Sequence, residues 1–244
     1  MMGPLFFELC VESLEGARAA EFGGADRIEL CSQIEVGGVT PTPGMMMACS
    51  AALSIPVHVL VRPRAGDFVF TSAEYDEMRR QIDTARDAGA QGVAIGVLRA
   101  GARVDVERTR ALVELARPMG VTFHRAFDET SDRGQALEDV VATGADSLLT
   151  SGGAPDVLSG AMSIARLAQQ AGDRIHIIAG GGLRLANLLE VVRRSGILSL
   201  HGSLTREAMA SMGRDPRALE NSVREARRLL REAHGEQALT VPEP

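Results

Sequence analysis

The chain has 244 residues, of which 45% are apolar and 24% charged, a composition typical of a water-soluble globular protein with a sizeable core. Its net charge of −6 argues against nucleic acid and anionic membranes as partners, because both call for a basic stripe. Three cysteines are too few, and odd in number, for a secreted disulfide framework. No leader-like segment precedes Glu8, and no apolar run could span a bilayer. We therefore expect a cytoplasmic protein.

Eight short apolar or alternating runs follow one another along the chain, each followed by a segment long enough for a helix. This order is typical of βα units and predicts a parallel sheet. Thr71 and Glu74 have capping-box spacing and predict the start of one of the helices. The expected strands are Leu5 to Cys10, Arg27 to Cys31, Val57 to Arg62, Val93 to Leu98, Val121 to Arg125, Leu148 to Ser151, Ile175 to Ala179 and Ile197 to His201.

A weak internal repeat favours closure of this sheet. Gly24 to Leu30 resembles Gly89 to Ile95 and Gly144 to Thr150, as if a glycine ended each preceding helix. We predict an α/β protein, a single-domain parallel (β/α)8 TIM-type barrel, with a doubly wound open sheet as the alternative. The barrel is expected over 1–204, a C-terminal helical segment packed on it over 205–234, and a flexible tail over 235–244.

Charged residues gather where several predicted strands end, which is where parallel barrels carry their ligand sites. Strand alternation places Glu8 with Cys10, and Glu29 with Cys31, on common faces. The candidates for proton transfer are Glu8, Glu29, His124 and Asp128, and those for binding an anionic substrate are Arg62, Arg64, Asp67 and Arg125. The alternative is a ring of internal salt bridges that pairs Glu8 or Glu29 with Arg62 or Arg125. His58 lies deeper along its strand, which favours a structural role.

A second candidate site lies after the seventh and eighth strands, where barrels commonly bind phosphate through backbone N–H groups. Its residues would be Gly180, Gly181, Gly182, Gly202 and Ser203. Alternatively, these glycines serve only tight turns.

Cys10 and Cys31 form the candidate metal site. Two thiolates from neighbouring strands suit a soft ion such as Cu(I), and we expect no other cofactor. Their spacing of 21 residues matches no local motif, so two small buried core residues are the alternative.

Several of these segments together resemble the copper homeostasis protein CutC family: Gly23 to Cys31, Gly37 to Pro41, Arg62 to Arg64, Gly66 to Phe68, Val121 to Asp128 and Leu149 to Gly152. The resemblance runs in order from about Glu8 to Ser203. It implies a cytoplasmic TIM-type barrel, a homo-oligomer (dimer or higher), and an association with copper tolerance and Cu(I) binding. Ala65 and Gly202 depart from the residues usual in the family.

The resemblance leaves open whether the protein is an enzyme. One hypothesis is a cytosolic copper homeostasis protein that binds Cu(I) through Cys10 and Cys31. The alternative is a metal-independent barrel enzyme acting on a small phosphorylated or carboxylated metabolite. A copper ion or a small anionic metabolite is accordingly the expected partner.

Overall fold

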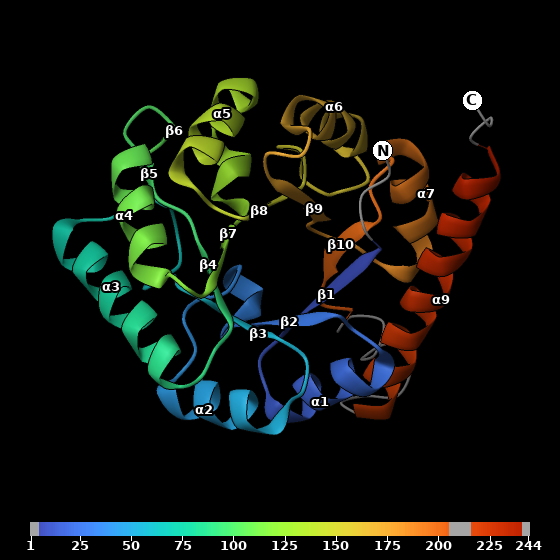
Figure 1. Cartoon of the computed structure of the whole chain (residues 1–244), viewed down its shortest axis with the longest axis horizontal. Coiled ribbons are helices and arrows are strands. Elements are labelled where there is room, and N and C mark those ends of the chain that lie inside the picture. Colours follow the sequence, from blue (N-terminus) through green and yellow to red (C-terminus); the bar gives the residue numbers. More distant parts are fainter. Residues whose placement is uncertain (1–4, 205–215, 241–244) are drawn as a thin grey trace.

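The computed structural model describes residues 5–204 and 216–240, in which eight parallel strands close into a barrel (Figure 1). Around the barrel each strand pairs with the next in chain order, and the last pairs with the first. This confirms the predicted (β/α)8 fold. The strands are β1 (Phe6–Val11), β2 (Arg27–Leu30), β3 (Val57–Leu60), β4 (Gly92–Ile95), β7 (Gly120–Phe123), β8 (Ser147–Thr150), β9 (His176–Gly180) and β10 (Ser199–Gly202).

Helices surround the barrel, and their ends follow local sequence signals. Thr71 and Glu74 form the predicted capping box at the start of α3. Gly24 and Gly144 end α1 and α5 with φ of 90° and 81°, a conformation that favours glycine and that accounts for the internal repeat. The helices are α1 (Leu14–Gly23), α2 (Pro43–Ala52), α3 (Ser72–Asp87), α4 (Val106–Ala116), α5 (Arg133–Thr143), α6 (Ala161–Ala171), α7 (Leu185–Ser195) and α9 (Pro216–Thr240), with 3-10 turns η1 (Ile34–Val36) and η2 (Arg125–Glu129).

Three predicted strands end two or three residues earlier than expected. The run from Val93 to Leu98 stops at Ile95, and Leu98 instead begins β5 (Leu98–Arg99), which pairs antiparallel with β6 (Arg103–Val104). At Gly96 a Cβ would lie 2.5 Å from the His124 ring, so the absence of a side chain makes room for that ring. Strands β3 and β7 end two residues before Arg62 and Arg125, which places both arginines in the loops that follow.

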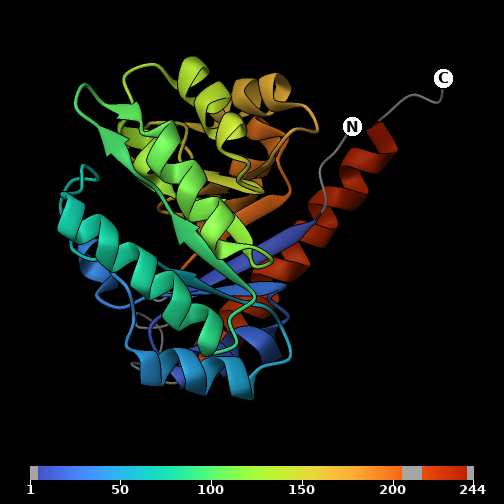
Figure 2. The same ribbon diagram turned by 60° about the vertical axis from the view of Figure 1, so that its left-hand side comes forward.

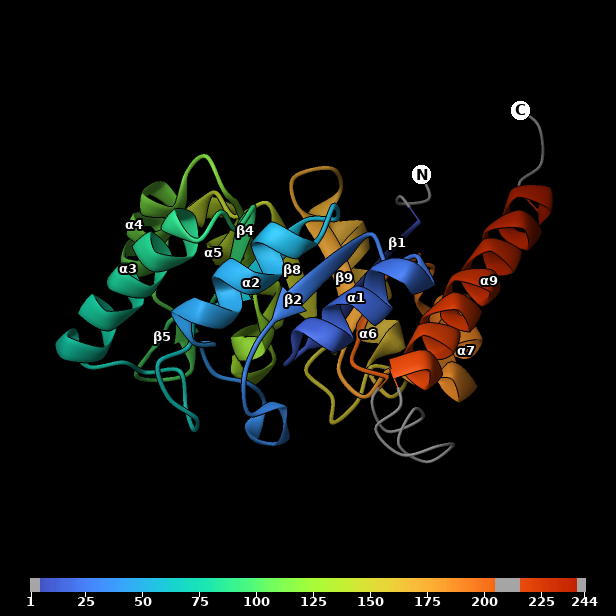
Figure 3. The ribbon, with the colours of Figure 1, turned by 90° about the horizontal axis from the view of Figure 1, so that it is seen from below.

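Helix α9 takes the eighth place in the helical layer, packed against α1 and α7 (Figures 2 and 3). It therefore completes the ring around the barrel. It also runs to Thr240, so residues 235–240 belong to the helix and not to the expected tail. Residues 205–215 and 241–244 lie outside the described part of the chain. Within the described part, each helix is either too short or too polar to cross a bilayer.

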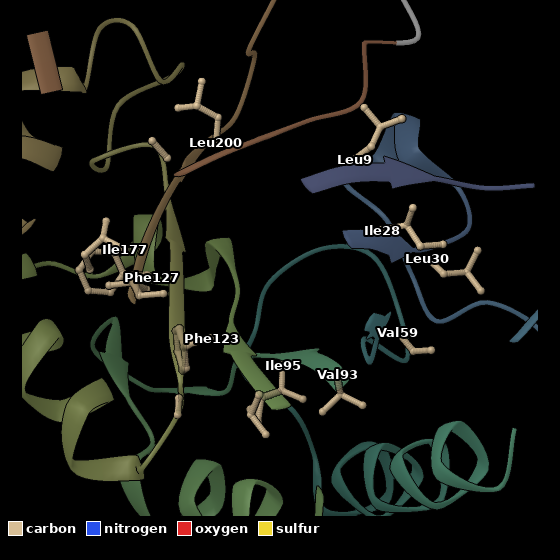
Figure 4. Packing of buried hydrophobic residues seen from close by; sticks show 14 of the residues in the cluster. Leu9, Ile28, Leu30, Val59, Val93, Ile95, Phe123, Phe127, Ile177 and Leu200 are labelled. Carbon is tan, nitrogen blue, oxygen red and sulfur yellow. The ribbon is translucent and has the colours of Figure 1, made fainter. Parts of the chain in front are cut away.

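Strand alternation separates an apolar layer from a polar barrel interior. Leu9, Ile28 and Leu200, on three neighbouring strands, belong to the apolar core that continues into the helical layer (Figure 4). The intervening positions, such as Glu8 and Arg27, carry charged side chains that are nonetheless buried. The barrel interior is thus the part of the fold in which polar chemistry is concentrated.

The α1–α9 contact yields the first prediction. A Cβ at Gly23 would lie 2.5 Å from Val223 and 2.8 Å from the backbone oxygen of Glu220, both on α9. Gly23→Ala should therefore lower the free energy of unfolding by about 1–3 kcal/mol, in spite of the better helix propensity of alanine. Gly44→Ala is the matched control, because a Cβ there meets nothing within 4 Å. Urea denaturation of both variants measures the difference, and equal stabilities would contradict the packing described.

Candidate functional site

Glu8 lies inside the barrel between two cationic groups. In the strand register Glu8 faces Arg27 on one side and His201 on the other. Arg27 Nε donates to Glu8 Oε2, and His201 Nδ1 lies 2.7 Å from Glu8 Oε1 and donates to it. Burial would raise the pKa of Glu8, but the charge of Arg27 and the hydrogen bond from His201 hold it well below its usual range. Glu8 is therefore an ionised carboxylate with both oxygens engaged.

His201 also faces Glu29 on β2. Its Nε2 lies 3.8 Å from Glu29 Oε2, so the imidazole sits between two carboxylates. Burial opposes protonation, but Glu29 and Glu8 raise the pKa of His201 above its ordinary value. Burial also raises the pKa of Glu29, although His201 counteracts this effect. Both carboxylates therefore favour the charged form of the His201 imidazole.

The two predicted metal ligands lie next to this pair. Cys10 Sγ is 3.2 Å from Cys31 Sγ, and both thiols are buried. One donor atom from each of Cys10, Glu29 and His201 lies within 4.8 Å of the other two. The hydrogen bond with Cys31 and burial raise the pKa of Cys10 well above its ordinary value, so without a metal the thiol stays protonated. The structure thus brings together two thiols, a carboxylate and an imidazole; we call these four side chains the thiol cluster.

Arg27 contacts two further polar side chains besides Glu8. Arg27 Nη1 is 3.5 Å from His58 Nε2, and Arg27 Nη2 is 3.4 Å from Thr122 Oγ1. A Cβ at Gly92 would lie 2.2 Å from the His58 ring, so this glycine accommodates the imidazole. Burial, and then the charge of Arg27, lower the pKa of His58 to about 3. His58 is therefore neutral, and its ring occupies the space left by Gly92.

Of the arginines predicted at the mouth, Arg62 binds the backbone of two loops and not Glu8 or Glu29. Arg62 donates to the backbone oxygens of Gly38 (2.9 Å) and Gly66 (2.6 Å), and its guanidinium stacks on Phe68. It therefore ties the loop after β2 to the loop after β3. Of the two carboxylates that sequence reasoning paired with Arg62 or Arg125, Glu8 is paired with Arg27 instead, and Glu29 faces His201.

Arg64 and Asp67 form a separate group on the loop after β3. Arg64 donates to Asp67 Oδ1 at 2.9 Å and to Glu74 Oε1, at the start of α3, at 2.6 Å. Both side chains are substantially exposed. The structure thus does not bring them to the thiol cluster.

Asp128 is held by hydrogen bonds from the loop after β8. It accepts from Thr150 Oγ1, from the backbone N–H groups of Ser151 (3.0 Å) and Gly153 (3.0 Å), and from Arg125 Nε (2.9 Å). A carboxylate that accepts this many hydrogen bonds is fixed in place. The hydrogen bonds of the Asp128 side chain therefore link η2 to the end of β8 and the loop that follows it.

His124 is buried at the end of β7. Its Nδ1 accepts from the N–H of Ala126 at 3.2 Å, and its Nε2 has no hydrogen-bond partner. Burial, followed by the charge of Arg62, lowers the pKa of His124 to about 3, so the ring is neutral at physiological pH. The ring lies 5.1 Å from that of Phe68, which covers it.

The predicted phosphate-binding glycines have packing partners. A Cβ at Gly202 would lie 3.3 Å from Leu183, and one at Gly180 would lie 2.7 Å from Leu149. A Cβ at Gly181 would lie 2.9 Å from Arg125 Cζ. A phosphate site formed by Gly180 to Gly182, Gly202 and Ser203 stays a prediction, and the cation Arg125 lies beside Gly181.

Sequence reasoning missed Arg27 and His201. Because side chains alternate along a strand, Ser199 and His201 lie on the same face of β10, which predicts that His201 points into the barrel. In a closed barrel the last strand pairs with the first, which predicts that His201 lies beside β1. Arg27 was considered only as part of a motif, although it shares a face with Glu29. These two signals were present in the sequence.

The fold and site define a class: a parallel (β/α)8 barrel with a buried thiol–carboxylate–imidazole cluster near the carboxyl ends of β1, β2 and β10. The model of the CutC family matches residues 5–206, so the chain belongs to the CutC family.

Relatives named CutC agree with this assignment. The chain is 46% identical over 199 residues to one from Caulobacter vibrioides, covering 82% of this chain and 81% of the relative. It is 42% identical over 205 residues to one from Chromobacterium violaceum, covering 84% and 83%. The crystal structure of CutC from Streptococcus agalactiae superposes with a TM-score of 0.77 at 28% identity, over 82% of this chain and 100% of the other.

The neutral His124 yields the second prediction. Its folded-state pKa of about 3 lies below the ordinary 6.5, so the unfolded chain binds a proton first as the pH falls. The stability it contributes is complete above pH 6.5 and is lost toward pH 3, by up to about 1.4 kcal/mol per pH unit. His124→Asn keeps an acceptor for Ala126 but cannot be protonated, so its unfolding free energy should fall less steeply.

Urea melts at stepped pH between about 6.5 and 4 measure this slope. His234→Asn is the control, because His234 is exposed on α9 and should leave the slope unchanged. A His124→Asn slope equal to that of the wild type would show that His124 is protonated in the folded protein.

Proposed function

We propose that this protein acts in copper homeostasis by binding Cu(I) through Cys10 and Cys31. The observation that carries the proposal is the 3.2 Å separation of the two buried sulfur atoms. Thiolates are preferred ligands of Cu(I), and two of them suffice for a linear complex. The relative from Streptococcus agalactiae carries a name that links it to copper homeostasis.

The surroundings of the two thiols suit a soft ion. Leu60 and Ala94 pack against them in a small buried apolar group, which limits the access of water. Because the Cys10 thiol is protonated without metal, Cu(I) binding must release its proton. We also propose a cytoplasmic location and a homo-oligomer, a dimer or higher; the three free cysteines accord with a reducing compartment.

The third prediction tests the two ligands. Cys10→Ser and Cys31→Ser should each weaken Cu(I) binding by at least about tenfold, because a hydroxyl is a poor ligand for a soft ion. Cys49→Ser is the matched control, since Cys49 is also buried but lies on α2. Competition with a chromogenic Cu(I) chelator under anaerobic, reducing conditions gives the affinities. Undiminished binding by the Cys10→Ser, Cys31→Ser double variant would refute the proposal.

A metal-independent enzyme acting on a small phosphorylated or carboxylated metabolite is the alternative function. It is favoured by Arg125, whose partly exposed guanidinium lies beside Gly181 at the end of β9. Barrels commonly bind phosphate at this corner.

Calorimetric titration with inorganic phosphate tests this alternative. Arg125→Ala should abolish phosphate binding, whereas the control Arg64→Ala should preserve it, because Arg64 is paired with Asp67 and Glu74 on another loop. No phosphate binding by the wild type would dismiss the alternative.

A further inference from the structure

Two side chains of the thiol cluster have no part in a two-thiolate copper complex. Glu29 and His201 face Cys10 from the neighbouring strands β2 and β10, and all three are buried. A nitrogen and an oxygen donor beside two sulfurs form a mixed set, which Cu(I) does not require but which zinc commonly uses.

The donor atoms are already close to the separations that a tetrahedral ion needs. Cys10 Sγ lies 3.2 Å from Cys31 Sγ, and His201 Nε2 lies 3.8 Å from Glu29 Oε2. Zinc–ligand bonds of about 2.0–2.3 Å place the donors of a tetrahedron roughly 3.3–3.8 Å apart. The remaining separations within Cys10, Glu29 and His201 are at most 4.8 Å. Shifts of about 1 Å or less would therefore bring Cys10, Glu29 and His201 around one ion, and Cys31 Sγ, 3.2 Å from Cys10 Sγ, supplies the neighbouring fourth donor.

The imidazole is held in the orientation that coordination requires. Glu8 accepts the Nδ1 hydrogen of His201 at 2.7 Å, which leaves Nε2 directed at Glu29. Arg27 in turn fixes the other oxygen of Glu8. A carboxylate that receives the second N–H of a ligating histidine is the usual outer partner in zinc sites. Glu8 is therefore a positioning residue, and it also accounts for a buried carboxylate so close to the cluster.

We propose that Cys10, Cys31, Glu29 and His201 form a four-donor site for a divalent ion of the zinc type. The inference rests on the proposed function in taking the two cysteines as metal ligands. It extends that function in the ion that the site accepts: Cu(I) needs the sulfur pair alone, whereas a tetrahedral divalent ion engages all four side chains. The two ions compete for Cys10 and Cys31.

Cobalt(II) is the probe, because it reports zinc-type geometry by its absorption. The full chain, reduced and metal-free, is titrated with Co²⁺ and then with Zn²⁺. The expected result is one Co²⁺ per chain, with the intense visible bands of tetrahedral cobalt and thiolate-to-cobalt charge transfer, both removed by Zn²⁺. Weak octahedral bands without charge transfer in the wild type would overturn the proposal, and this outcome depends on no variant folding.

Single substitutions test which side chains bind the ion. His201→Ala should weaken Co²⁺ binding by at least about tenfold, and Glu8→Gln by about 10–100-fold through loss of orientation. His176→Ala is the matched control, since this inward histidine on β9 bonds to Ser199 and not to the cluster. Wild-type affinity in folded His201→Ala would refute the assignment of His201.

Cu(I) affinity, measured in parallel on the wild type, separates the two proposals. Cu(I) binding without tetrahedral Co²⁺ binding overturns the four-donor site and leaves the copper proposal standing. Tetrahedral Co²⁺ binding without Cu(I) binding supports the four-donor site and overturns the copper proposal.

Discussion

The ion pair between Glu8 and Arg27 organises the barrel interior. Glu8 has both oxygens occupied, by Arg27 and by His201, and Arg27 extends the network to His58 and Thr122. One polar network thus joins β1, β2, β3, β7 and β10 across the lumen. Transfer of charges from water is costly, and loss of one partner would leave the other buried and unpaired.

Much of the fold was accessible from the sequence, because local signals and barrel topology agree. The eight apolar runs, the capping box at Thr71 and the glycines that end α1 and α5 all correspond to features of the structure. The errors lie at strand ends. The run to Leu98 contains Gly96, and apolar character continues through it because Leu98 is buried in the hairpin and not in the barrel wall. Hydropathy cannot separate these two kinds of burial.

The site was less accessible, because alternation predicts which face a residue occupies but not which residue it meets. The alternation pattern correctly predicted that Cys10 and Cys31 lie side by side. It did not supply the partner of Glu8, since His201 is 193 residues away and becomes its neighbour only when the barrel closes. Nor could it show that Arg62 is satisfied by nearby carbonyl oxygens of two loops. That choice depends on loop conformations that have no sequence period.

Closure of the barrel between β1 and β10 also has a consequence for biosynthesis. Cys10, Glu29 and Cys31 leave the ribosome before His201 and before α9, which packs against α1 beside this seam. A nascent chain therefore carries two thiols without the imidazole that completes the thiol cluster. The full cluster arises only after His201 has been made, so the proposed four-donor site is completed late in synthesis, and a product truncated before His201 lacks one of its proposed ligands.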